Sequence, residues 1–163
     1  MNPNRRMMLG GLGAALCGGV ALFVGHRPVE AQREDFPFRL TDAEWRRRLS
    51  PSQYAVLRGH ATERAGTSPL DREHRRGTFH CAGCDLPLFS STAKFDSRTG
   101  WPSFFRPLPR AVGTSTDRQL GYARTEVHCA RCGGHLGHVF PDGPPPTGQR
   151  YCMNGVAMTF RAA

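Results

Sequence analysis

Helix-forming signals occur in one short part of the chain, between residues 41 and 57. Residues 41–44 read Thr-Asp-Ala-Glu, a capping box that predicts a helix burying Trp45 and Leu49. Residues 50–53, Ser-Pro-Ser-Gln, predict a second short helix with proline at its first helical position. The side chains predicted to pack from this second helix are those of Tyr54, Val56 and Leu57. No helical periodicity follows residue 60.

Later residues predict short strands separated by glycine and proline turns. Residues 77–80 and 125–128 each lead into a pair of cysteines, and residues 86–89 lead out of the first pair. Residues 59–77 are polar and contain turn signals, so they are predicted to form an extended surface arm. A last strand is predicted over residues 150–154. The predicted fold is mainly β, with two small antiparallel sheets and short helices at the N-terminal edge.

The N-terminus has the pattern of an export signal. Paired arginines, Arg5 and Arg6, directly precede an uncharged stretch of 18 residues, Met7 to Val24, which is rich in glycine and alanine. This pattern resembles a twin-arginine signal. We therefore expect a signal peptide over residues 1–31, one domain over residues 32–163 and a periplasmic location. The alternative is an uncleaved anchor that holds the domain facing the periplasm, because 18 apolar residues just reach the length of a membrane span.

Four cysteines form two C-x-x-C pairs, Cys81 with Cys84 and Cys129 with Cys132. This spacing lets two thiolates of one tight turn bind the same tetrahedral ion, so the pairs predict one structural zinc per chain. Because 44 residues separate the pairs, the zinc would join two distant hairpins. Two disulfides or a thioredoxin-like redox pair are the alternatives. No βαβ pattern surrounds either pair, which argues against the thioredoxin-like alternative.

The charge balance is basic without indicating a nucleic-acid partner. From Gln32 onward the chain has 19 basic and 12 acidic residues, a net charge of +7, and Lys94 is the single lysine. The clusters Arg46–Arg48 and Arg75–Arg76 lack the interleaved aromatic side chains of a groove for single-stranded nucleic acid. We therefore expect a solvated arginine surface and no nucleic-acid partner.

Cys152 stands apart from the paired cysteines and has neighbours suited to thiol chemistry. If the last predicted segment is a strand, alternation places Arg150, Cys152 and Asn154 on one face. A guanidinium beside a thiol is expected to favour the thiolate, the reactive form. His135 and His138 are candidates for proton transfer near neutral pH. Metal ligation is the alternative role for this histidine pair, but four cysteines already complete a tetrahedral zinc.

Three motifs together closely resemble the B-type methionine sulfoxide reductases. They are Gly-Trp-Pro-Ser-Phe at residues 100–104, His-Leu-Gly-His-Val-Phe-Pro-Asp-Gly at residues 135–143 and Arg-Tyr-Cys-Met-Asn at residues 150–154, in a chain with both C-x-x-C pairs. The resemblance covers residues 41–160. It implies the fold of that family and reduction of the R epimer of methionine sulfoxide, mainly in oxidised proteins and with the free amino acid as an open alternative.

The resemblance also implies roles for the groups around the thiol. Cys152 attacks the sulfoxide sulfur and becomes a sulfenic acid while methionine departs. His138 and His135 supply or organise the proton that the sulfoxide oxygen needs. Asn154 orients this network, and Arg150 assists the thiolate.

Two aromatic residues are implied to bind the substrate. Trp101 would offer an apolar face to the methyl group on the sulfoxide sulfur, and Phe140 would close the pocket beside it. The alternative for Trp101 is a core position, but it lies in a Gly-Trp-Pro turn. Trp45, on the first predicted helix, is assigned to the core.

This chain departs from the family pattern at two places. Thr99 stands where many members have a resolving cysteine, so we expect the sulfenic acid to be reduced by an external thiol, such as a thioredoxin-like protein. Gly155 and Val156 stand where the family usually has serine and alanine. The membrane is expected to matter only through the export signal, and the protein is expected to be a monomer.

Two other classes of function compete with this interpretation. A zinc-ribbon module that binds nucleic acid would explain the four paired cysteines and the basic charge, but not Trp101, the histidines or Cys152. A periplasmic thiol oxidoreductase or disulfide isomerase would use the C-x-x-C pairs as redox groups instead of zinc ligands.

Overall fold

The computed structural model describes residues 36–163. The predicted export signal over residues 1–31 lies outside these described residues. Within residues 36–163, no helix is both long enough and apolar enough to span a bilayer.

Both predicted helices are confirmed, with the predicted caps. In α1 (Asp42–Arg48) the Thr41 hydroxyl accepts from the Glu44 N–H, and the Glu44 side chain accepts from the Thr41 N–H. The second helix, α2 (Pro51–Leu57), has the same reciprocal arrangement between Ser50 and Gln53. These bonds satisfy amide donors that a helix start leaves open, so the two helices begin where the local sequence directs them.

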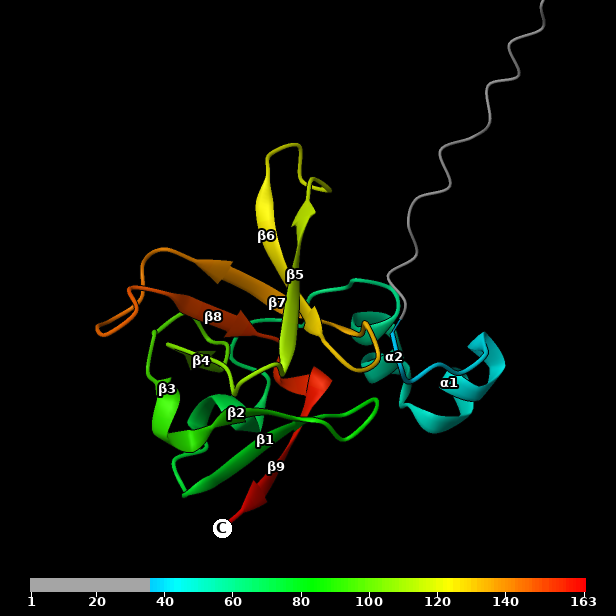
Figure 1. Cartoon of the computed structure of the whole chain (residues 1–163), viewed down its shortest axis with the longest axis horizontal. Helices are drawn as coiled ribbons and strands as arrows, with labels where there is room; N and C mark the ends of the chain where they lie inside the picture. Colours follow the sequence, from blue (N-terminus) through cyan, green and yellow to red (C-terminus); the bar gives the residue numbers. More distant parts are fainter. Residues whose placement is uncertain (1–35) are drawn as a thin grey trace, which may run out of the picture. The chain divides into compact units, whose positions relative to one another are not determined.

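The strands form two antiparallel sheets, which confirms the predicted fold class. The smaller sheet has the order β2-β1-β9, with β1 (Gly77–Cys81), β2 (Pro87–Ser90) and β9 (Met158–Ala162). The larger sheet has the order β3-β4-β8-β7-β6-β5, with β3 (Lys94–Phe95), β4 (Ser103–Phe104), β5 (Val112–Asp117), β6 (Arg124–Cys129), β7 (His135–Phe140) and β8 (Arg150–Met153). The β5–β6 hairpin projects at one end of the domain and β9 runs toward the other (Figure 1).

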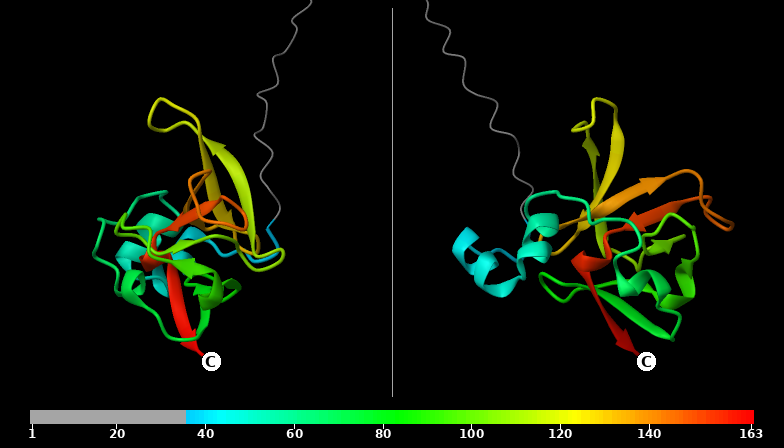
Figure 2. Two further views of the ribbon diagram at one scale, coloured as in Figure 1. Left: turned by 90° about the vertical axis from the view of Figure 1, so that its left-hand side faces the viewer. Right: turned by 180° about the vertical axis from the view of Figure 1, so that it is seen from behind.

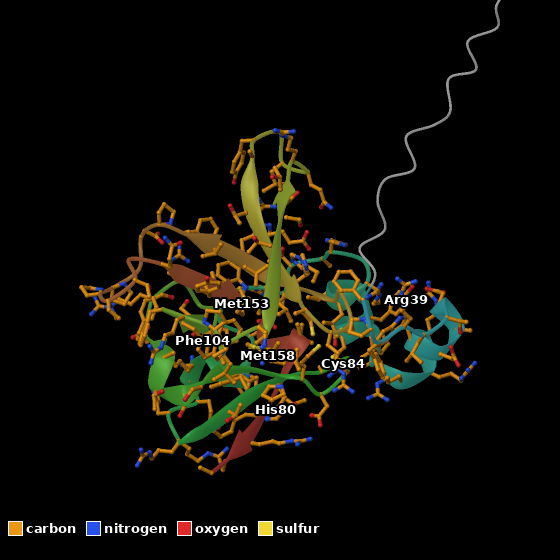
Figure 3. The ribbon with its side chains drawn as sticks, in the orientation of Figure 1. Arg39, His80, Cys84, Phe104, Met153 and Met158 are labelled. Carbon is orange, nitrogen blue, oxygen red and sulfur yellow. The ribbon has the colours of Figure 1, made fainter. Side chains whose placement is uncertain are left out.

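The core lies between the two sheets. Phe104 and Met153 come from the larger sheet and Met158 from the smaller one, and all three are buried (Figure 3). The rings of Phe79 on β1 and Phe104 on β4 make an edge-to-face contact across this layer, with centroids 4.9 Å apart. Trp45 is only 4% exposed, which confirms its predicted core position.

Several elements differ from the sequence prediction. The sixth strand of the larger sheet, β5, was not predicted. Its sequence, Val-Gly-Thr-Ser-Thr-Asp, has no hydrophobic alternation, yet it pairs with β6 over six residues. The predicted surface arm contains a short 3-10 helix, η1 (Pro69–Arg72). Two further 3-10 helices, η2 (Ser91–Ala93) and η3 (Gly155–Ala157), lie outside this arm.

Strand β8 ends at Met153, so Asn154 is the first residue of the turn into η3 and not part of the strand. The views from the side and from behind show how the chain passes from β8 through η3 into β9 (Figure 2).

Candidate active site

One row of directly opposed residues crosses the larger sheet at Cys152. Ser103 on β4 and His138 on β7 are the register partners of Cys152 on β8. The row continues to Glu126 on β6, which lies opposite His138, and to Ser115 on β5. Directly opposed residues project from the same face of a sheet. Strand pairing therefore brings a thiol, an imidazole and a carboxylate into one line.

A pocket of about 120 Å³ lies on this row. Five of the predicted site residues line it, namely Trp101, His138, Phe140, Cys152 and Asn154, together with Thr62, Arg124 and Gly137. His135 and Arg150 do not line this pocket. Its size suits the end of one side chain and not a whole peptide.

Gly137 makes the close approach of β7 and β8 possible. A Cβ at this position would overlap the backbone oxygen of Cys152. The glycine between the two histidines therefore lets the imidazole of His138 lie beside the thiol strand, since any side chain would push the strands apart.

The thiol of Cys152 is half-buried, and this governs its charge. Burial raises the pKa of Cys152 above its ordinary value, while Thr99, Arg150 and Ser103 act in the opposite direction with smaller effect. Cys152 is therefore a neutral thiol at rest, although Arg150 acts on its pKa in the expected direction, toward the thiolate. The desolvation penalty on the charged form outweighs the attraction of the guanidinium.

Arg150 is engaged by another group. Its Nε and terminal nitrogen donate to the two carboxylate oxygens of Asp142 at 2.9 and 2.8 Å. Its guanidinium also lies over the Phe140 ring, 4.6 Å from the centroid. Arg150 thus holds Phe140 and the loop that begins at Asp142, and it also acts on the thiol of Cys152, whose pKa it lowers.

His138 is held by an ionised carboxylate. Its Nε2 lies 2.8 Å from Oδ2 of Asp117, and Arg124 donates to the same oxygen at 2.5 Å. The backbone N–H of Gln119 is the largest of the influences that lower the pKa of Asp117 to about 2, and His138 and Arg124 add to it. Because a carboxylate only accepts, Nε2 of His138 carries the hydrogen and Nδ1 is the acceptor.

His138 is also neutral at rest. Burial lowers its pKa more strongly than the carboxylate of Asp117 raises it, and the charge of Arg124 lowers it further. The resting site therefore pairs a neutral thiol with a neutral imidazole that has a free acceptor nitrogen. Strand register places this imidazole opposite Cys152, which makes His138 the candidate general base for that thiol.

His135 belongs to a second histidine–carboxylate cluster. Its Nδ1 lies 2.7 Å from Oε1 of Glu126, and Nδ1 of His60 lies 3.1 Å from the same oxygen. Burial tends to raise the pKa of Glu126, but hydrogen bonds from His135, His60 and Ser115 hold it below its usual range. The ring of His135 meets that of His138 edge-on, with centroids 5.4 Å apart, so this cluster supports His138 from behind the pocket.

Asn154 fixes one wall of the pocket. Its side-chain oxygen accepts from the Glu63 N–H at 2.9 Å, and its amide nitrogen donates to the Leu136 carbonyl at 3.1 Å. The indole N–H of Trp101 donates to the Glu63 carbonyl at 3.1 Å. Glu63 is thus the point to which both the amide and the tryptophan are tied, and Trp101 faces the pocket and not the core.

The family departure at Gly155 has a structural compensation. A Cβ at Gly155 would overlap the hydroxyl of Ser68, whose side chain is buried. This hydroxyl accepts from the Leu70 N–H at 3.2 Å. A serine side chain therefore occupies the space beside position 155, but it comes from the arm that precedes β1.

The four paired cysteines converge as predicted. They are buried, their sulfur atoms all lie within 4.8 Å of one another, and the pairs Cys81–Cys132 and Cys84–Cys129 are separated by 3.7 and 3.5 Å. These separations are too long for disulfides. They match the edge of roughly 3.8 Å of a tetrahedron with metal–sulfur bonds of about 2.3 Å. The cluster ties the β1–β2 hairpin to the β6–β7 hairpin and is a metal-binding site by its geometry.

Four polar residues that support the histidines were not predicted from the sequence: Asp117, Arg124, Glu126 and His60. Arg124 and Glu126 gave a signal, because they alternate along the strand that leads into the second cysteine pair, with a spacing typical of one face. Asp117 and His60 gave none, since both lie in polar stretches and meet their partners only through tertiary structure.

Comparison with known proteins assigns the chain to a family. The model of the SelR domain matches residues 49–162. The peptide methionine sulfoxide reductase MsrB of Agrobacterium fabrum is 56% identical over 121 residues, which cover 74% of this chain and 90% of that protein. The MsrB of Thiobacillus denitrificans is 57% identical over 121 residues (74% and 92%), and that of Thioalkalivibrio sulfidiphilus is 49% identical over 134 residues (82% and 98%). This chain therefore belongs to the SelR family, that of the MsrB peptide methionine sulfoxide reductases.

Proposed function

We propose that this protein reduces the R epimer of methionine sulfoxide in peptides to methionine, with Cys152 as the nucleophile. The observation that carries the proposal is the pairing of Cys152 with His138 in a pocket walled by Trp101 and Phe140. The pocket combines a thiol, a proton acceptor and an apolar surface. Membership of the MsrB family supports the same reaction and the R epimer.

The reaction balances with the groups present. Nδ1 of His138 takes the thiol proton, and the thiolate of Cys152 attacks the sulfoxide sulfur. The attack forms a transient S–S bond, and the imidazolium returns the proton to the sulfoxide oxygen. The hydroxyl then transfers to the sulfur of Cys152 as its bond to the substrate sulfur breaks, and the S–S bond breaks with its electron pair going to the departing methionine, which leaves Cys152 as a sulfenic acid. The substrate sulfur is reduced by two electrons and the cysteine sulfur is oxidised by two. Asp117 stabilises the imidazolium in the interval, as an oriented carboxylate does in a triad.

Recognition of the sulfoxide follows from the pocket walls. The indole of Trp101 presents an apolar face to the methyl group, and Phe140 limits the pocket on another side. Because the sulfoxide sulfur is a stereocentre that carries an oxygen, a methyl group, a methylene group and a lone pair, a methyl group fixed on Trp101 and an oxygen fixed near His138 select one epimer. His135, from outside the pocket lining, and Asn154, in the pocket wall, keep this frame rigid.

The oxidised enzyme requires an external thiol. Among residues 36–163, the other four cysteines belong to the metal-binding cluster, and Thr99 stands beside Cys152 where a resolving cysteine would be useful. The reductant attacks the sulfenic acid of Cys152, water leaves, and a second thiol releases the reductant as a disulfide. A thioredoxin-like protein is the reductant class that we propose.

The metal that we propose for the cysteine cluster is one structural zinc. Cys81, Cys84, Cys129 and Cys132 provide four sulfur ligands and leave no open position, which is the pattern of a structural site. Zinc bound there would stabilise the junction of the two sheets and take no part in the reaction.

We also propose export to the periplasm through residues 1–31, with the domain acting there as a monomer. The paired arginines and the uncharged stretch that follows support this location. The test fuses residues 1–35 to a reporter that is exported only when already folded. Replacement of Arg5 and Arg6 by lysine should retain the reporter in the cytoplasm, and export that persists without the arginine pair would refute the twin-arginine route.

The activity itself is tested with separated epimers of a blocked methionine sulfoxide. We expect turnover of the R epimer by the wild-type enzyme with dithiothreitol and none by the Cys152→Ser variant. Turnover of the S epimer alone would refute the proposal.

A further inference from the structure

A groove much larger than the active-site pocket lies next to it. Its volume is about 600 Å³, and α2, the arm over residues 61–70 and η3 form its walls. The apolar side chains that line it are those of Val56, Leu70, Val156 and Met158, with Ala61 and Pro69 at exposed positions. The mechanism described above uses none of these side chains.

The groove has an unusual charge for this protein. Residues 36–163, which the structure describes, contain 18 lysines and arginines, yet none of these lines the groove. The one ionisable residue in its lining is Glu63, whose carboxylate already accepts from the backbone N–H groups of Gly155 and Val156. The groove therefore offers an uncharged, largely apolar surface inside a basic protein, which suits an apolar ligand.

The groove and the active-site pocket adjoin at Thr62. This exposed residue lines both, and the neighbouring residues Asn154 and Gly155 line the pocket and the groove respectively. The pocket, at about 120 Å³, holds only the end of one side chain. The backbone of a peptide whose methionine sulfoxide enters the pocket must leave it, and the exposed rim at Thr62 is an exit into the groove.

We propose that the groove binds the uncharged, apolar polypeptide segment that flanks the methionine sulfoxide of a protein substrate. This inference rests on the proposed function, because the substrate itself supplies the occupant. Methionines with apolar neighbours in sequence become the preferred targets.

The groove is built before any ligand binds. The Glu63 carboxylate ties the arm to η3, and the Ser68 hydroxyl caps η1 through the Leu70 N–H. Ser68 also packs directly on Gly155, which has no side chain to interfere. A preformed groove loses little entropy on binding, so that contact with a flanking segment contributes directly to affinity.

The test measures kcat/KM of the full-length enzyme, first on two substrates. One is N-acetyl methionine-R-sulfoxide methylamide, and the other is an eight-residue peptide with the same sulfoxide between leucine and valine neighbours. The wild-type enzyme should favour the peptide roughly tenfold or more, the gain expected when one apolar side chain is buried. A third substrate, with aspartate and lysine neighbours, should lose this advantage.

A variant tests whether the advantage of the apolar peptide in kcat/KM comes from the groove. Ala61→Trp fills it from an exposed position and should lower the ratio of peptide to single-residue kcat/KM toward one. Ala162→Trp, at an exposed position of β9 outside the groove lining, is the matched control and should keep the wild-type ratio.

The outcomes separate this inference from the proposed function. No turnover of the single-residue R epimer would refute the function itself. Turnover of that epimer with no advantage for the apolar peptide, or an equal advantage for the charged peptide, would overturn the groove inference alone. If Ala61→Trp does not fold, the wild-type kcat/KM values on the three substrates still show whether the enzyme favours apolar neighbours.

Discussion

The hydroxyl oxygen of Thr99 lies 3.9 Å from the sulfur of Cys152. A side chain at position 99 is thus within contact distance of the reactive atom, although the two residues are far apart in sequence. The position that this chain fills with threonine is one from which a second thiol would reach the sulfenic acid.

Replacement of Thr99 by cysteine should therefore create an internal recycling pathway. After one turnover without reductant, Thr99→Cys should form a disulfide between positions 99 and 152, which peptide mapping detects. Thr99→Ser is the matched control and should leave a sulfenic acid that a dimedone reagent traps. A Thr99→Cys enzyme that keeps its sulfenic acid for as long as the control would show that the two positions are not in reach during catalysis.

The carboxylate of Asp117 should matter for catalysis although it touches no substrate. The substitution Asp117→Asn replaces an acceptor-only carboxylate with an amide that can also donate, so the tautomer of His138 is no longer fixed and kcat should fall on the order of 10². Asp117 raises the pKa of His138, so its loss should also move the acid limb of the kcat/KM profile to lower pH. Asp42→Asn, which breaks the exposed pair with Arg46, serves as the control. An unchanged kcat and acid limb in Asp117→Asn would contradict this role.

The resting thiol should react slowly with alkylating agents below pH 9. Burial raises the pKa of Cys152 above the ordinary thiol value of 9.0, so the thiolate fraction grows only as the pH passes that value. The rate of alkylation by iodoacetamide, followed by mass spectrometry in the absence of substrate, should have its midpoint above pH 9. A midpoint below pH 8 would mean that Arg150 holds a thiolate in the free enzyme after all.

The metal-binding cluster should be structural. Cys132→Ser should lose bound zinc, measured by elemental analysis, and should unfold at a much lower temperature, since structural zinc stabilises small domains by about 10 kcal/mol in apparent terms. The variant Cys152→Ser makes the same replacement of sulfur by oxygen at a cysteine outside the cluster. It should therefore keep one zinc per chain and the wild-type melting temperature. If both variants retain zinc and stability equally, the four cysteines do not hold the ion.

The parts of this structure that depend on neighbours in sequence were predictable. The caps at Thr41 and Ser50, the two C-x-x-C turns and the strand around Cys152 each follow from a few adjacent residues. The support of the active site was not predictable in this way. Asp117 reaches His138 because β5, β6 and β7 pair in a particular register, and no local pattern encodes that register.

Arg150 illustrates the same limit. The alternation of β8 predicted that it would act on Cys152, and it does lower the pKa of that thiol, but its hydrogen bonds go to Asp142, eight residues earlier, across the loop before the strand. The charge state of the thiol then depends on how deeply the folded protein buries it, which a linear sequence does not state. Burial and non-local partners account for the differences between the predicted and the observed site.

The central claim is that Cys152 alone performs the reduction step, and a single-turnover experiment tests it most directly. Metal-loaded enzyme is mixed with excess methionine-R-sulfoxide peptide and no reductant, and both the methionine formed and the state of Cys152 are measured. We expect the wild-type enzyme to form one methionine per chain and to carry a sulfenic acid on Cys152 with no disulfide. The Cys152→Ser variant should form no methionine. Methionine formed by Cys152→Ser, or wild-type turnover that oxidises a cysteine of the metal-binding cluster instead, would contradict the central claim.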